Sequence, residues 1–222
     1  MTQSISKNTV NYSQQALVSP ECTTLSKNNS PIQLGVMASG SGTNFEAVAK
    51  AIANGKLNAD IKVLIYNNPN ALAKVKAEKY QIPAVLIDHK KYNAREDLDS
   101  KIVAIMQSYG VEWIIMAGWM RVVTQVLLDS YPNRVINIHP SLLPSFKGIR
   151  AIEQALKAKV KITGCTVHFV SLAVDSGDII MQAAVPILPQ DTPETLHKRI
   201  QIQEHRILPQ AISITANSIS KK

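Results

Sequence analysis

The chain has 222 residues, of which 45% are hydrophobic, and a formal net charge of +8. This length and apolar content suit one compact domain. The chain has no purely apolar stretch of about 18 residues or more, so we expect no transmembrane helix. The first residues lack the apolar run of a secretory signal. A cytoplasmic location, or the equivalent compartment of an organelle, is therefore expected.

The positive charge is spread along the chain, because the lysines do not cluster with aromatic residues. Neither a zinc finger nor an aromatic RNA-binding signature is present. A positive field also attracts small ligands that carry phosphates or carboxylates. The sequence thus favours small anionic substrates over nucleic acid, and its two cysteines fit no metal-binding spacing.

Residues 1–31 are rich in Ser, Thr, Asn and Gln and predict a disordered leader. After the leader, apolar runs alternate with segments of helical periodicity. Strands are expected at 33–38, 61–66, 84–87, 112–116, 134–138, 161–170 and 178–186. A first helix is expected to begin at about residue 43, and further helices at 71–79, 95–109, 124–128 and 193–212. The alternation predicts a Rossmann-like, doubly wound α/β fold, with a mostly parallel sheet and helices on both faces. One catalytic domain should span 32–213, with a C-terminal tail at 214–222.

The first candidate site is the loop Ser39-Gly40-Ser41-Gly42-Thr43-Asn44, between a strand and a helix. Its small residues let backbone N–H groups approach an anion at the helix N-terminus. A dinucleotide site would need a third glycine where Phe45 stands and an acidic residue at the end of the second strand. Because both are missing, the loop favours a lone phosphate, although an ordinary tight turn explains it equally well.

The stretch Asn137-Ile138-His139-Pro140-Ser141-Leu142-Leu143-Pro144 is the most informative signal. Side chains two apart on a strand share a face, so Asn137 and His139 should point the same way. They stand at the end of a strand, where α/β sheets bind ligands. An amide next to an imidazole could stabilise an oxyanion.

Asp175 lies in a polar loop between two later strands and could act as a general base or orient a histidine. His168 alternates with apolar residues and could simply line the sheet. A zinc site formed by His139, His168 and Asp175 is an alternative that the spacing does not require. Ser141 lacks the surroundings of a nucleophilic serine.

Two further segments are candidates for ligand binding. Ala117-Gly118-Trp119-Met120-Arg121-Val122 follows the fourth strand and could hold a flat heterocycle, or could merely pack under the sheet. Gln201 and Glu204 share a face of the last helix, where Glu204 could bind an amine or be only solvated.

These motifs together resemble the folate-dependent glycinamide ribonucleotide formyltransferases. The resemblance rests on SGSGTNF at 39–45, AGWMR at 117–121, NIHPSLLP at 137–144, GCTVHFV and DSG within 164–177, and IQEHR at 202–206, in this order. It covers about residues 33–212. It implies transfer of a formyl group from 10-formyltetrahydrofolate to the amine of the ribonucleotide, without a metal.

The resemblance also implies roles for particular residues. Asn137, His139 and Asp175 match the catalytic triad. The loop that holds the ribonucleotide phosphate is matched by Gly42, Thr43 and Asn44. Glu204 matches a residue near the substrate amine. Met120, Arg121, Val122 and Val123 match the pterin-binding segment, Arg95 meets the folate tail, and Asn137 also faces the folate. No role is transferred to the variable segment 145–151.

Related activities differ in the domains that accompany this centre. A tRNA formyltransferase would carry a further C-terminal domain, and a formyltetrahydrofolate deformylase an N-terminal regulatory domain and a second histidine in place of Pro140. A non-catalytic nucleotide-binding module is possible on fold alone. We expect small-molecule substrates, no nucleic acid or membrane partner, and a monomer or homodimer.

Overall fold

The structure, a computed structural model, describes residues 16–21 and 30–219, with side chains up to residue 216. The strands are β1 (Val18–Ser19), β2 (Ile32–Ala38), β3 (Ala59–Tyr66), β4 (Ala84–Leu86), β5 (Trp113–Met116), β6 (Val135–His139), β7 (Ile162–Phe169) and β8 (Ile179–Pro186). The helices are α1 (Thr43–Ala53), α2 (Ala73–Lys79), α3 (Arg95–Ser108), α4 (Gln125–Ser130), α5 (Ala151–Lys157) and α6 (Pro193–Ile219), with a 3-10 turn at His89–Lys91.

The strands form one sheet in the order β1-β8-β7-β6-β5-β2-β3-β4. Strands β6, β5, β2, β3 and β4 are parallel, whereas β7, β8 and β1 join antiparallel at the other side. The predicted mostly parallel, doubly wound sheet is confirmed. The chain moves outward from β2 to β4 and returns to β5, so the strand order reverses between β2 and β5. This is where such sheets bind ligands.

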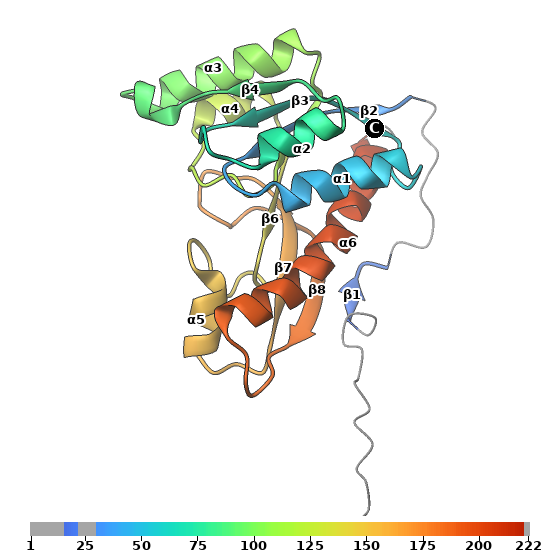
Figure 1. Cartoon of the computed structure of the whole chain (residues 1–222), viewed down its shortest axis with the longest axis vertical. Helices are drawn as coiled ribbons and strands as arrows, with labels where there is room; N and C mark the ends of the chain where they lie inside the picture. Colours follow the sequence, from blue (N-terminus) through green and yellow to red (C-terminus); the bar gives the residue numbers. More distant parts are fainter. Residues whose placement is uncertain (1–15, 22–29, 220–222) are drawn as a thin grey trace, which may run out of the picture.

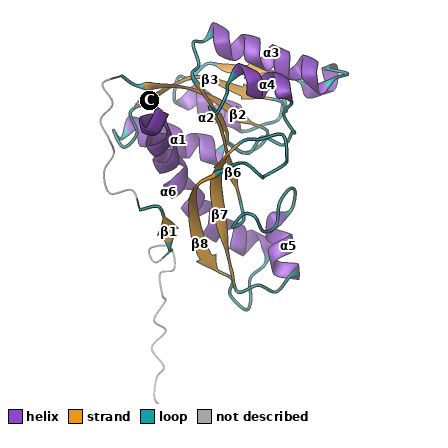
Figure 2. Ribbon diagram, turned by 180° about the vertical axis from the view of Figure 1, so that it is seen from behind, coloured by secondary structure: helices purple, strands orange, loops and turns teal. Residues whose placement is uncertain are grey.

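Alternating side chains bury both faces of the sheet. In β5, Trp113 and Ile115 pack into the core under α1, α2 and α6, whereas Ile114 and Met116 pack under α3 and α4. Figure 1 shows β3 and β4 between α3 and α2. Helix α6 crosses in front of β7 and β8 there and behind them in Figure 2. Because helices cover both faces, ligands can reach the parallel strands only at their ends.

Three expectations about element boundaries need correction. Part of the leader is a strand, since Val18 is buried and β1 pairs with β8, while residues 1–15 and 22–29 lie outside the described part. Helix α6 continues to Ile219, because Ala211, Ile212 and Ala216 prolong its buried face, so the tail does not begin at 214. Helix α5 follows the variable segment and was not expected. None of the described helices combines the length and apolarity that crossing a bilayer demands.

Candidate active site

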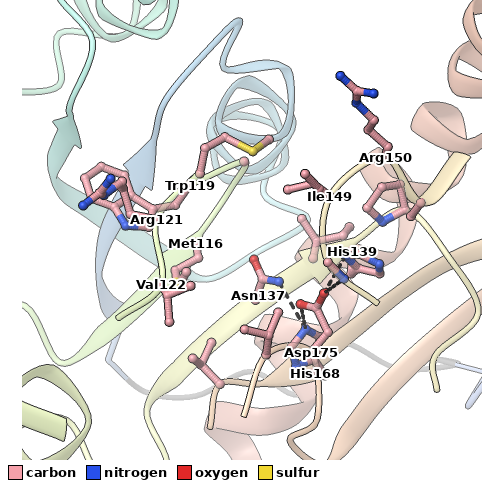
Figure 3. Close-up of a pocket in the computed structure, with 18 of the residues that line it drawn as sticks. Met116, Trp119, Arg121, Val122, Asn137, His139, Ile149, Arg150, His168 and Asp175 are labelled. Carbon is pink, nitrogen blue, oxygen red and sulfur yellow. Dashed lines mark hydrogen bonds and ion pairs between the residues drawn. The ribbon is translucent and has the colours of Figure 1, made fainter. Parts of the chain in front are cut away.

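A cavity of about 690 Å³ opens at the carboxyl ends of β5 and β6. Its walls come from the loop after β5, the end of β6, residues 148–153, the loop after β7 and the beginning of α6. Figure 3 shows Asn137, His139, His168 and Asp175 clustered on one side of this cavity, opposite the loop that carries Arg121 and Val122. A polar centre therefore faces a wall of largely apolar side chains.

The structure brings the three predicted catalytic residues together. Asn137 and His139 stand two apart on β6 and line the same cavity. Asp175 reaches them from the loop after β7, and its Oδ2 lies 3.2 Å from His139 Nδ1. The two side chains are only 10% and 7% exposed, respectively. Water therefore screens this ion pair little.

The hydrogen bonds of His139 indicate that its ring is charged. Its Nδ1 faces the carboxylate of Asp175, and its Nε2 lies 2.8 Å from the carbonyl oxygen of Phe146. Both partners are acceptors, and only the imidazolium ion has a proton on each ring nitrogen. A charged ring at this position would stabilise an oxyanion that forms in the cavity.

The acidity of Asp175 fits this arrangement. Burial alone would raise its pKa, but hydrogen bonds at the carboxylate, including that from the Gly148 amide, and the nearby His139 ring outweigh burial and lower the pKa below its ordinary value. The Gly148 N–H donates to Oδ2 at 2.7 Å. Asp175 is therefore an ionised partner for His139 at neutral pH.

The segment 145–151, to which sequence reasoning gave no role, supports this centre through its backbone. Phe146 supplies the acceptor for His139, and Gly148 supplies the donor for Asp175. Phe146, Gly148 and Arg150 all have positive φ angles, of 56°, 76° and 57°. Gly148, which tolerates this conformation without cost, was the only sequence signal that could have pointed to the turn.

The predicted pterin segment forms the opposite wall. Met120, Arg121, Val122 and Val123 all line the cavity. Met120 is 74% and Val122 45% exposed, although both are apolar. Apolar side chains that face a cavity in this way suit a flat, largely apolar ligand.

The predicted phosphate loop lies at the beginning of α1 and contacts α6. Gly42 has a φ of +67°, and a Cβ there would lie 2.7 Å from Ala73. Gln201 Nε2 donates to Thr43 Oγ1 at 3.0 Å, and Asn44 Nδ2 donates to Glu204 Oε2 at 3.0 Å. These residues do not line the 690 Å³ cavity. The structure therefore places Glu204 against the loop that carries Gly42, Thr43 and Asn44.

Glu204 is an unusual carboxyl group because it is buried, with 5% of the residue exposed. Burial raises its pKa, although the hydrogen bond from Asn44 acts in the opposite direction. The side-chain oxygen of Asn44 has no partner among the described residues. This pair therefore retains capacity to bind a polar ligand.

Arg95, predicted to meet the folate tail, is exposed at the first residue of α3 and does not line the cavity. Among residues 16–21 and 30–219, no three His, Cys, Asp or Glu side chains are grouped so as to hold a metal ion.

Comparison with known proteins connects this geometry to a family. The formyl transferase family pattern matches residues 33–212. The chain belongs to the formyl transferase family. It is 39% identical over 180 residues to the phosphoribosylglycinamide formyltransferase of Bacillus subtilis, covering 81% of this chain and 92% of that protein. The predicted family is confirmed.

Solved structures of this formyl transferase family agree with the fold. Glycinamide ribonucleotide transformylase 1 from Symbiobacterium toebii has a TM-score of 0.84 and 42% identity, covering 86% of this chain and 90% of that one. The phosphoribosylglycinamide formyltransferase of Bacillus halodurans has a TM-score of 0.79 and 40% identity, covering 82% and 93%. The chain is also 41% identical to the trifunctional purine biosynthetic protein adenosine-3 of Gallus gallus, covering 84% of this chain but only 18% of that protein.

Proposed function

We propose that the chain transfers a formyl group from 10-formyltetrahydrofolate to the amine of 5'-phosphoribosylglycinamide, a step of de novo purine synthesis. The observation that carries this proposal is the convergence of Asn137, His139 and Asp175 on one cavity at the end of β6. The similar proteins of the family are named for this same activity. No metal takes part in the proposed reaction.

In the proposed reaction, the amine nitrogen attacks the formyl carbon and forms a tetrahedral intermediate. An Asn137 N–H and the positive charge of His139 stabilise its oxyanion. Asp175 keeps His139 charged and assists proton transfer from the attacking amine. The bond from the formyl carbon to N10 of the folate then breaks, and the amine's proton ends on N10.

The remaining predicted residues divide between the two substrates. We propose that Gly42, Thr43 and Asn44 hold the ribonucleotide phosphate, and that Glu204 binds the same substrate from α6. The segment from Met120 to Val123, together with Asn137, holds the folate. Arg95 meets the folate tail at the surface. Alignment of amine and formyl carbon by rigid strand ends supplies much of the rate enhancement.

Folate turnover measured with and without the ribonucleotide tests this function. We expect turnover only when the ribonucleotide is present, with one formylated product for each folate consumed. Equal turnover without it would mean that water is the acceptor, as in a deformylase. Binding of the ribonucleotide without any turnover would indicate a non-catalytic module.

Several properties stay predictions of the sequence. They are a cytoplasmic location, a monomeric or homodimeric state, and binding of small-molecule substrates but not of nucleic acid or membranes.

A further inference from the structure

A second histidine belongs to the catalytic cluster. His168 lies on β7 directly opposite Asn137 of β6, and it is 2% exposed. Figure 3 shows it beside Asp175 and below Asn137. We propose that His168 is a positioning residue that stays neutral, with its proton on Nδ1, and holds the amide of Asn137 with its NH₂ group toward the reaction centre. This inference rests on the proposed function.

Nδ1 of His168 faces a hydrogen-bond acceptor. It lies 2.7 Å from the carbonyl oxygen of Phe169, which can only accept a hydrogen bond. The β7–β8 register shifts between Val167 and His168, and such an irregularity re-aims a side chain. A Cβ on Gly177 would lie 1.9 Å from that same carbonyl oxygen, so the returning chain packs against it. Nδ1 therefore carries a proton.

Nε2 of His168 faces the side-chain amide of Asn137. Asn137 Nδ2 is 3.1 Å from Nε2, whereas the nearer oxygen of Asp175 is 3.6 Å away. The amide nitrogen is a donor, so it pairs with a bare Nε2 and not with an N–H. A neutral His168 with its proton on Nδ1 satisfies both contacts at once.

The charges of the cluster lead to the same assignment. One carboxylate, that of Asp175, faces two imidazoles, those of His139 and His168. His139 has an acceptor at each nitrogen, so it takes the positive charge. A second buried cation would lack a counter-charge and would be costly. The two histidines thus have different roles, because His139 carries the charge and His168 accepts a hydrogen bond.

The protonation state of His168 matters for the reaction because the Asn137 amide can turn either its NH₂ group or its oxygen toward the ring. With His168 neutral, one Asn137 N–H is held by Nε2 and the other remains free for the oxyanion. If His168 gained a proton on Nε2, the amide would have to turn its oxygen toward the ring. The NH₂ group would then leave the reaction centre, and kcat would fall at acid pH.

Nitrogen NMR of the full-length protein labelled with 15N-histidine tests the protonation states directly and needs no turnover. At neutral pH we expect His168 to have a bare Nε2 and a protonated Nδ1, and His139 to have both nitrogens protonated. The spectrum of His168→Gln identifies the His168 signals. A protonated Nε2 on His168 at neutral pH would overturn the proposal.

Kinetics of two variants test the consequence. His168→Gln retains an acceptor oxygen near the position of Nε2, whereas His168→Met has similar bulk without one. We expect His168→Met to lower kcat by roughly 10- to 100-fold, less than loss of a whole oxyanion donor, with both KM values nearly unchanged. His168→Gln should restore most of kcat and remove the acid-side loss caused by His168.

Equal losses of kcat in the two variants, at equal melting temperatures, would show that the acceptor does not matter. If the wild-type protein failed to transfer formyl groups, the proposed function would fall, whereas the NMR result would still decide the state of His168.

Discussion

At the scale of single residues, the candidate site consists of two separate sets of hydrogen-bonded polar groups. His139 joins Asp175 and Phe146, and Asn137 joins His168. The proposed phosphate loop has its own buried pair, Asn44 and Glu204. Because the two sets share no residue, a change in one should affect one substrate more than the other.

Replacing Asn44 with alanine tests this separation. We expect Asn44→Ala to weaken ribonucleotide binding by roughly 10-fold or more, because it removes a polar group from the loop and leaves buried Glu204 without its donor. Folate binding should change much less. Calorimetric titration with each ligand measures both effects. Asn54→Ala, at the exposed far end of α1, is the control, and equal losses for both ligands in Asn44→Ala would refute the assignment.

At the scale of elements, the proposed phosphate loop is held where α1, α2 and α6 meet. Glu46 of α1 binds Lys76 at 2.6 Å and Lys79 at 3.3 Å, both on α2. The hydrogen bond from Lys76 is the main cause that lowers the pKa of Glu46 from 4.5 to about 2, against the opposing effect of burial. These ion pairs hold α1 and α2 together beside the loop.

The depressed pKa of Glu46 predicts a pH dependence of stability. A carboxyl whose pKa is lower in the folded state stabilises the protein above 4.5 and loses this effect as the pH falls toward about 2. At about pH 6, Lys76→Met should lower the free energy of unfolding by roughly 1 kcal/mol. The difference from wild type should shrink below pH 4.5, as measured by urea denaturation. Lys74→Met, on the same helix but paired with exposed Glu78, should have little effect at any pH. A Lys76→Met loss that does not vary with pH would contradict the account.

The close approach of α2 to the proposed phosphate loop predicts a difference between two glycines. Gly42 and Gly55 both have a φ of +67°, but only at Gly42 would a Cβ meet Ala73, at 2.7 Å. Both alanine variants should lose about 1–2 kcal/mol from the left-handed backbone. Gly42→Ala should lose more, and should also weaken ribonucleotide binding. Equal melting temperatures for the two variants would show that the contact with Ala73 is unimportant.

The observed helices and strands can be compared with those predicted from the sequence. Strands β2 and β3 and helix α3 begin and end within about two residues of their predicted bounds, because apolar periodicity is strong there. The predicted end of α6 was wrong because Pro209 lies inside the helix without ending it, and no glycine or proline follows Ile212. The family motifs predicted the triad residues, and the structure brings them together. The contacts of Phe146 and Gly148 involve backbone groups, so no side-chain pattern could reveal them.

At the scale of the whole molecule, the sheet is extended beyond the part that matches the family. Strand β1 pairs with the edge strand β8, where Ala184 N donates to Leu17 O at 2.9 Å, whereas the family match begins at residue 33. An uncovered edge strand leaves backbone groups free to pair with other chains. Residues 16–21 therefore protect one edge of the sheet, several strands from the candidate active site.

Deletion of residues 1–21 should lower stability by about 1–2 kcal/mol, since it removes a few backbone hydrogen bonds and the buried Val18 side chain. The value of kcat should not change, because the site lies at β5 and β6. Deletion of residues 1–15 keeps β1 and serves as the control. Thermal unfolding measures the difference, and identical melting temperatures for both deletions would show that β1 contributes nothing.

The most direct test of the whole account compares wild type with His139→Ala in a formyl-transfer assay alongside ribonucleotide titration. We predict that the variant loses at least about 100-fold in kcat, because the charged ring at the reaction centre is gone, while its ribonucleotide Kd changes only slightly. A variant that transfers formyl groups at nearly the wild-type rate would contradict the catalytic role of the triad.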